Sequence, residues 1–139
     1  MGEYKITKAI EFCYGHRLLS HNGKCGYLHG HNGQLEIDVT ACGLDDLGMV
    51  RDFADVQETV KGWIDQNLDH RMILNKDDVF VSILESAQEP VFVLDDNPTA
   101  ENIARLVYEQ AESQGLAVSE VRLWAVSYTH LTLPTILLV

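Results

Sequence analysis

Residues 28–41 read Leu-His-Gly-His-Asn-Gly-Gln-Leu-Glu-Ile-Asp-Val-Thr-Ala, and this stretch decides the fold. In its second half, apolar and polar side chains alternate, so that Leu35, Ile37 and Val39 lie on one face of an extended strand. Their polar neighbours lie on the other face. The pattern predicts a strand with one face in the core and one face toward solvent.

A second strand is expected immediately before it, over residues 4–18, where apolar side chains recur loosely at every second position. A polar loop containing glycine, residues 20–26, separates the two segments. Two strand-like segments joined by such a loop predict a hairpin.

The rest of the chain contains two helical patterns and two further strands. The first is a helix that is capped by Asp55 and reaches about Leu68, and an irregular stretch and a short strand at 91–94 follow it. The second helix opens at 97–102 and ends at Gly115, and a strand at 118–124 comes last. The inner helical faces are expected to be Val56, Val60, Trp63, Ile64 and Leu68, then Ile103, Leu106, Val107 and Ala111. This order predicts an α+β fold with both helices on one face of an antiparallel sheet.

The net charge of −11 argues against nucleic-acid binding, because an acidic surface repels a phosphate backbone. A phosphorylated substrate would need a local basic cluster, for which Arg17, Lys24 and Arg71 are the candidates. No stretch is apolar enough for a membrane helix, and the N-terminus lacks the features of a signal peptide. We therefore expect a cytoplasmic protein with no membrane partner.

The chain has three cysteines, an odd number that argues against a disulfide framework. Cys13 and Cys42 lie in strand-like segments and are expected to be small buried hydrophobic residues. Cys25 lies in the polar loop, where it has access to chemistry.

Three histidines are placed to hold one metal ion. His29 and His31 are two positions apart in a strand, so both imidazoles project from the same face. His16 ends the preceding strand, and hairpin pairing brings it to the same end of the ladder. Three neutral imidazoles favour Zn²⁺ in a tetrahedral site with one open position, the arrangement of catalytic zinc.

The role of Cys25 is open on spacing alone. As a fourth ligand it would close the metal site and make it structural. Beside Lys24 and a metal ion, its thiolate form would be favoured, and it would act as a nucleophile or base.

Asp69 and His70 are a candidate proton relay, in which the carboxylate orients the imidazole. The alternative for this pair is a solvated helix C-terminus. We assign no role to His21 or His130.

The last fourteen residues, 126–139, do not continue the sequence pattern of the preceding chain, and they end on an apolar run. Residues 126–135 look like the translation of a transposase adapter used in making sequencing libraries. We therefore expect a single domain over residues 1–125 and a non-native read-through tail over 126–139. The alternative is a genuine edge strand followed by a short tail.

Five motifs occur in order along the chain: Phe12-Cys-Tyr-Gly-His-Arg-Leu, Cys25-Gly-Tyr-Leu-His-Gly-His-Asn, Gly48-Met-Val-Arg-Asp-Phe, Leu68-Asp-His-Arg and Asn97-Pro-Thr-Ala-Glu-Asn. With them, residues 4–124 resemble the 6-pyruvoyltetrahydropterin synthase superfamily, which includes bacterial 6-carboxytetrahydropterin synthase of the queuosine pathway. The resemblance implies the tunnelling fold, a unit of two strands, two helices and two strands. Its sheets join into a barrel in a homo-oligomer, typically a hexamer.

The resemblance also implies roles for nine residues. The zinc ligands would be His16, His29 and His31, the catalytic residues Cys25, Asp69 and His70, and the pterin-contacting turn Thr99, Ala100 and Glu101.

The activity implied is a zinc-dependent lyase reaction of queuosine biosynthesis, converting 7,8-dihydroneopterin triphosphate to 6-carboxy-5,6,7,8-tetrahydropterin. A close alternative is formation of 6-pyruvoyltetrahydropterin with the same residues. An alternative from another class is a non-catalytic zinc-binding domain whose site Cys25 closes.

One position departs from the pattern of the superfamily. The superfamily usually has Glu-Thr directly after the aromatic residue of the last strand, and that Glu anchors the aminopyrimidine edge of the pterin. Here Trp124 is followed by Ala125 and Val126. The chain as written therefore lacks its substrate anchor.

Overall fold

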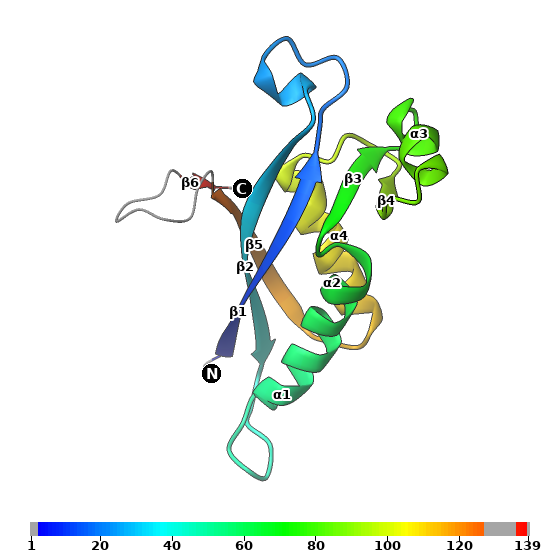
Figure 1. Ribbon diagram of the computed structural model, residues 1–139. Helices are drawn as coiled ribbons and strands as arrows, with labels where there is room; N and C mark the ends of the chain where they lie inside the picture. The colour runs from blue at the N-terminus through cyan, green and yellow to red at the C-terminus, as the bar shows by residue number, and fades with distance from the viewer. Residues whose placement is uncertain (1–2, 127–135, 139) are drawn as a thin grey trace.

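The computed structural model describes residues 3–126 and 136–138, and a long hairpin is its central feature. Strand β1 (Tyr4–His16) pairs antiparallel with β2 (His29–Ala41) along their whole length, from Tyr4 opposite Ala41 to His16 opposite His29 (Figure 1). The predicted alternation is confirmed, because Leu35 and Ile37 of β2 are fully buried.

Four further strands complete a six-stranded sheet: β3 (Arg71–Asn75), β4 (Val91–Leu94), β5 (Val118–Val126) and β6 (Ile136–Leu138). The order across the sheet is β4-β3-β1-β2-β5-β6. Strands β1, β3 and β4 run parallel to one another, whereas β2, β5 and β6 make antiparallel pairs. The expectation of an antiparallel sheet is therefore wrong for β3 and β4. Parallel neighbours need a crossover, and α3 (Phe80–Ser86) provides one between these two strands.

The first helical segment is continuous from α1 (Phe53–Val56) through a π-helical turn (Gln57–Lys61) to α2 (Gly62–Asn67). Its cap is Asp52, not Asp55 as predicted. Asp52 has an extended backbone, and its carboxylate accepts a hydrogen bond of 2.8 Å from the N–H of Ala54, whereas Asp55 already lies in the first turn. The expected apolar face is confirmed, with Val56, Val60, Ile64 and Leu68 buried and Trp63 partly buried.

The second predicted helix is α4 (Ala100–Ser113), and its boundaries agree with the sequence signals. The hydroxyl of Thr99 accepts a hydrogen bond of 3.1 Å from the N–H of Asn102 and caps the helix. Gly115 adopts a φ of 93°, a left-handed conformation that ends a helix at little cost for glycine. On the inner face, Ile103, Val107 and Ala111 are buried and Leu106 is partly buried.

Strand β3 and helix α3 were missed, because both fall in the stretch expected to be irregular. Ile73 and Leu74 of β3 are adjacent and both fully buried, so the strand shows no alternation. Arg17, the residue after the end of β1, holds the start of α3 in place. Its guanidinium donates hydrogen bonds of 2.7 and 2.6 Å to Asp78. The same group lies 4.4 Å from the centre of the Phe80 ring. Arg17 is thereby neutralised and is not a free phosphate ligand.

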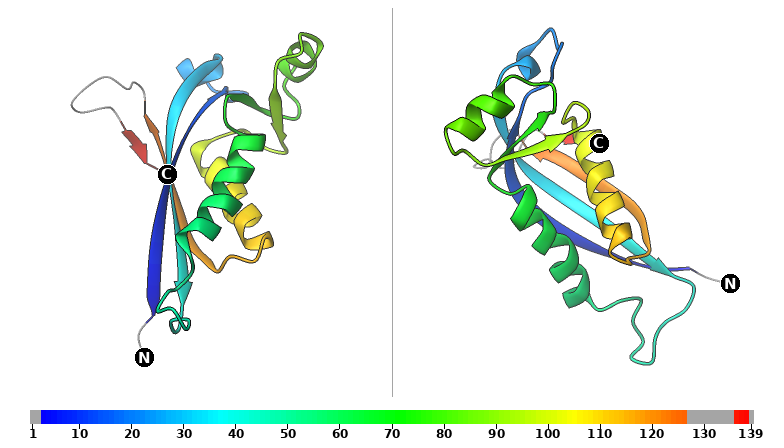
Figure 2. Two further views of the ribbon diagram at one scale, coloured as in Figure 1. Left: turned by 60° about the horizontal axis from the view of Figure 1, so that its bottom comes forward. Right: turned by 90° about the vertical axis from the view of Figure 1, so that its right-hand side faces the viewer.

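The helices α1, α2 and α4 cover one face of the sheet and leave the other face without helical cover (Figure 2). The core lies between these layers. Within residues 3–126 and 136–138, no helix is long and apolar enough to cross a bilayer. Of the predicted read-through tail, positions 127–135 and 139 lie outside the described residues, and residues 136–138 pair with β5 as an edge strand.

Candidate functional site

The three predicted histidine ligands converge at the end of the β1–β2 hairpin. His16 is the register partner of His29, and His31 lies on the same face of β2. The ring centroids are 4.5 Å apart for His16 and His29 and 4.9 Å apart for the other two pairs. One ligand atom from each residue lies within 4.8 Å of the other two. Strand pairing therefore produces the cluster that the spacing predicted.

Hydrogen bonds fix the tautomers of two of these rings. Nδ1 of His16 lies 2.6 Å from the carbonyl oxygen of Pro98, and Nδ1 of His29 lies 2.7 Å from that of Tyr27. Because a carbonyl only accepts, each Nδ1 carries the proton and each Nε2 keeps its lone pair.

Two buried ring nitrogens lack a hydrogen-bond partner in the part of the chain that the structure describes. They are Nε2 of His16 and Nδ1 of His31. Buried polar atoms are normally paired, so these two nitrogens call for a partner that a bound ion would supply. The donor set therefore fits a metal held by imidazoles.

Burial favours the neutral form of two of these histidines, His16 and His31. Desolvation lowers the pKa of His16 to about 4, helped by the neighbouring His29 and His31, although the hydrogen bond to Pro98 acts in the opposite direction. The pKa of His31 is also lowered, first by burial and then by His29. Neutral imidazole is the form that binds a metal, so the lowered pKa values of His16 and His31 favour metal binding at pH 7.

Tyr14 lies beside the histidines with an unsatisfied hydroxyl. Its ring centroid is 5.2 Å from that of His16, and the side chain is 3% exposed. Burial raises the Tyr14 pKa to about 12, so the hydroxyl keeps its proton, yet it has no partner among the described residues. The ring packs over Gly33, where an added Cβ would lie 3.1 Å from it, and Gly33 is the register partner of Ala125 in β5.

Cys25 lies in a short 3-10 turn (Lys24–Gly26) within the loop that joins β1 to β2. The carbonyl oxygen of Cys25 accepts a hydrogen bond of 2.8 Å from the N–H of Leu18, which ties the turn to the end of β1. Cys25 is partly buried, and its thiol lies outside the three-histidine group. Among residues 3–126 and 136–138, the three-histidine group thus has no fourth protein ligand.

Asp69 and His70 form the predicted pair, with Nδ1 of His70 2.9 Å from the Asp69 carboxylate. The structure places this pair beside Cys13, a contact that sequence reasoning missed. Cys13 was expected to be buried, but it is partly exposed because its side chain projects from the uncovered face of β1. Cys42, also expected to be buried, is exposed because it follows the last residue of β2.

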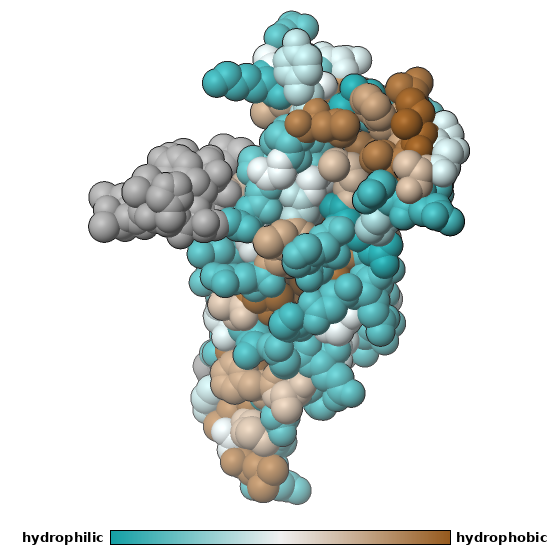
Figure 3. All heavy atoms as spheres, in the orientation of Figure 1, coloured by the Kyte–Doolittle hydropathy of each residue, from teal (hydrophilic) through white to brown (hydrophobic). Residues whose placement is uncertain are grey.

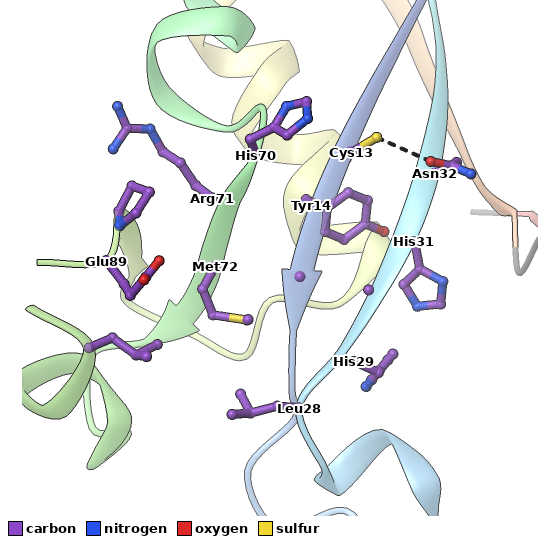
Figure 4. Close-up of a pocket in the computed structure, with 14 residues that line it drawn as sticks. Cys13, Tyr14, Leu28, His29, His31, Asn32, His70, Arg71, Met72 and Glu89 are labelled. Carbon is purple, nitrogen blue, oxygen red and sulfur yellow. Dashed lines mark hydrogen bonds between the residues drawn. The ribbon is translucent and has the colours of Figure 1, made fainter. Parts of the chain in front are cut away.

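A cavity of about 620 Å³ lies between the end of the hairpin, β3 and α3 (Figure 4). His29, His31, Cys13 and His70 contribute to its lining, together with apolar side chains that include Leu28 and Met72. Exposed apolar residues of the α3 region, including Val79 and Ile83, form a brown area near it in Figure 3. An apolar cavity with a few converging polar groups is typical of a small-molecule site.

The turn at residues 97–99 contacts the histidine group through the Pro98 carbonyl, which lies beside His16. Thr99 is occupied as the helix cap, Ala100 is buried, and Glu101 is exposed in the first turn of α4. Of the suggested basic cluster, Arg71 lines the cavity and Lys24 is exposed, whereas Arg17 is paired with Asp78.

Comparison with known proteins is decisive for the family. The sequence profile of the 6-pyruvoyl tetrahydropterin synthase family matches residues 5–132. The chain belongs to this family. Two relatives are named 6-carboxy-5,6,7,8-tetrahydropterin synthase. That of Rickettsia bellii is 42% identical over 127 residues, covering 86% of this chain and 92% of the relative. That of Haemophilus influenzae is 31% identical over 133 residues, covering 87% and 92%.

Solved structures confirm the α+β fold of the 6-pyruvoyl tetrahydropterin synthase family. An uncharacterized protein from Wolinella succinogenes has a TM-score of 0.74 at 27% identity, covering 93% of this chain and 96% of that one. The 6-pyruvoyl tetrahydropterin synthase of Caenorhabditis elegans has a TM-score of 0.63 at 23% identity, covering 88% and 89%. At this lower identity the likeness concerns the fold alone.

Proposed function

We propose that the protein is a pterin synthase that converts 7,8-dihydroneopterin triphosphate to 6-carboxy-5,6,7,8-tetrahydropterin with Zn²⁺ held by His16, His29 and His31. The observation that carries the proposal is the convergence of three histidines, without a fourth protein ligand among the described residues, in a chain of this family. The names of relatives at 42% and 31% identity favour the 6-carboxy product.

An open position separates this proposal from a structural zinc domain. A structural site has four protein ligands, whereas catalytic zinc keeps three and leaves one position for substrate or water. When bound, the ion would act as a Lewis acid that acidifies the hydroxyl groups of the substrate side chain. The Pro98 and Tyr27 carbonyls would orient the ligands by holding their Nδ1 protons.

Proton transfer is assigned to the residues around the metal. Cys25 would accept a proton from the substrate on the loop side of the centre. His70, oriented by Asp69, would carry a proton at the ring nitrogen that does not face the carboxylate. In this scheme Cys25 is the base and His70, oriented by Asp69, is the relay, and the two act at different positions. A separate base and relay are compatible with a lyase reaction that also releases acetaldehyde and triphosphate.

We further propose that the functional unit is a homo-oligomer in which sheets join into a barrel, with a hexamer as the expected size. The uncovered sheet face and the edge strand β4 support this proposal, because exposed edges favour pairing with another chain.

The test is turnover of 7,8-dihydroneopterin triphosphate by the zinc-loaded protein in which Ala125→Glu and Val126→Thr supply the residues that the superfamily resemblance implies, with products identified by mass spectrometry. We expect the 6-carboxy product, and loss of turnover in His29→Ala but not in the matched variant His21→Ala. A 6-pyruvoyl product would overturn the product assignment. A protein that retains zinc, binds no pterin and turns over nothing would instead be a zinc-binding domain.

A further inference from the structure

A second group of metal-ligating side chains lies apart from the histidine centre. It consists of Cys13 in β1 and of Asp69 and His70, which link α2 to β3. One ligand atom from each lies within 4.8 Å of the other two. Cys13 is three positions before His16, so strand alternation places their side chains on opposite faces of the sheet. The two groups are therefore separate donor sets.

Backbone contacts hold the three residues of this second group together. The N–H of His70 donates a hydrogen bond of 2.7 Å to the carbonyl oxygen of Cys13. In return, the N–H of Cys13 donates one of 3.0 Å to Oδ1 of Asp69. His70 also has a φ of 58°, a left-handed conformation that is uncommon outside glycine and persists only where surrounding contacts impose it. The donors are thus positioned before any ligand arrives.

The charges of the group suit a cation. Burial acts to raise the pKa of Asp69, but the N–H of Cys13 and the His70 ring outweigh it and lower that pKa, so the carboxylate is ionised. Nδ1 of His70 faces Asp69, which leaves Nε2 with a free lone pair on a side chain that is 78% exposed. The thiol of Cys13 donates a hydrogen bond of 3.1 Å to the amide oxygen of Asn32, which fixes the direction of its Sγ.

We propose that Cys13, Asp69 and His70 form a second zinc site. Thiolate and imidazole donors select Zn²⁺ over Mg²⁺ and Ca²⁺, which prefer all-oxygen sites. Cys13 and His70 both line the 620 Å³ cavity, so an ion and its remaining water molecule have a path of entry (Figure 4). Binding replaces the thiol proton with the ion, and one proton is released for each ion that binds.

A regulatory consequence follows, and this step alone rests on the proposed function. If Asp69 and His70 relay protons during turnover, an ion on both side chains removes them from the reaction. Zinc in excess of the histidine centre then inhibits the enzyme, and removal of the Cys13 thiol relieves that inhibition.

The experiment is a titration of metal-free full-length protein with Zn²⁺ in competition with a chromophoric chelator, repeated with Co²⁺. We expect two equivalents in the wild type and in Cys42→Ser, a matched change at an exposed thiol. Cys13→Ser should retain one equivalent of zinc. Its affinity for a second ion should be lower by about 100-fold or more, because loss of a ligand weakens metal binding at least as much as loss of a residue that orients a ligand. His70→Asn, at an exposed side chain, is a second variant that should also retain one equivalent and bind the second ion more weakly. The thiolate-to-Co²⁺ absorption should be lost in Cys13→Ser and kept in Cys25→Ser.

The two proposals fail in different ways in this titration. A wild type that takes one equivalent, lost in His29→Ala and kept in Cys13→Ser, overturns the second site and leaves the histidine centre standing. A single equivalent lost in Cys13→Ser and kept in His29→Ala overturns the histidine centre instead. Thiolate absorption that depends on Cys25 would also overturn the assignment of Cys13.

Discussion

The carbonyl oxygen of Pro98 lies 2.6 Å from Nδ1 of His16, across 82 positions of sequence. The turn that opens α4 therefore fixes the tautomer of a histidine in β1 and aims its Nε2 lone pair at the other two imidazoles. Loss of such a contact with a metal ligand typically lowers metal affinity by roughly 10- to 100-fold, because the contact holds the ring in one orientation. The helix and the hairpin thus build one centre.

Metal content tests that centre directly. His29→Ala removes one of three ligands and should lower the zinc content by one equivalent per chain, measured by elemental analysis after dialysis against a weak chelator. His21→Ala is the control, since His21 is exposed in the loop and outside the histidine group. An unchanged zinc content in His29→Ala, with the fold retained by circular dichroism, would contradict the assignment.

Cys25→Ala separates a base from a ligand. Because the thiol stands outside the three-histidine group, we expect the variant to retain its zinc and lose on the order of 10²-fold or more in kcat. Cys42→Ala, at an exposed thiol outside the site, serves as the matched control. Zinc loss in Cys25→Ala but not in Cys42→Ala would favour a closed structural site.

The histidine centre was predictable because the rules behind it are local. His29 and His31 share a face by strand alternation, and hairpin pairing brings His16 to the same end of the ladder. The helix faces followed in the same way from spacing, as the burial of Val60 and Ile64 shows.

What escaped prediction depends on contacts between distant segments. Strand β3 is short and its adjacent Ile73 and Leu74 are both buried, so its signal resembles that of any apolar run. The meeting of Cys13 with Asp69 and His70 requires β3 to lie parallel to β1, which no local pattern encodes. The cap at Asp52 was misplaced by three positions because Asp55 carries the same side chain.

Acid stability should depend on one ion pair on the uncovered face of the sheet. Asp38 is 3% exposed, and Arg122 donates hydrogen bonds of 2.8 and 3.0 Å to its carboxylate. This contact with Arg122 lowers the pKa of Asp38 from 3.8 to about 2, aided by Thr7 and opposed by burial. A lowered folded-state pKa means that the stabilisation, about 2 kcal/mol, is complete above pH 4 or so and is lost as the pH falls toward 2.

Asp38→Asn should therefore be less stable than the wild type at pH 7 and lose less stability on acidification. Urea denaturation at a series of pH values measures both effects. Asp46→Asn, at an exposed position in the turn after β2, is the matched control. An equal pH slope in Asp38→Asn and the wild type would show that the pair does not contribute.

Self-association should be visible in solution. Helices cover only one face of the sheet, and β4 is an edge strand of the sheet that the described residues form (Figure 2). We expect sedimentation of the purified protein at micromolar concentration to show a homo-oligomer. A monomer alone under those conditions would contradict the proposed barrel.

At position 125 the chain has an alanine, where the resemblance to the superfamily implies a glutamate that anchors the pterin. Ala125 is buried beside Gly33, over which the Tyr14 ring lies, and the Tyr14 hydroxyl lacks a partner among the described residues. A carboxylate at this position would offer an acceptor to that hydroxyl and to the guanidine-like edge of a pterin. Each charge-assisted hydrogen bond of this kind contributes about 1.5–3 kcal/mol, so its absence weakens substrate binding by more than roughly tenfold.

We therefore expect the chain as written to bind zinc but turn over pterin poorly, and Ala125→Glu combined with Val126→Thr to recover activity. Ala125→Gln is the matched control, because it fills the same volume without the charge and should recover less. Tyr14→Phe in the Ala125→Glu background should raise KM further if the hydroxyl orients the new carboxylate, while zinc content stays unchanged. Steady-state kinetics with 7,8-dihydroneopterin triphosphate measure each step. Full activity of the unmodified chain, or equal activity of the Glu and Gln variants, would show that position 125 does not anchor the substrate.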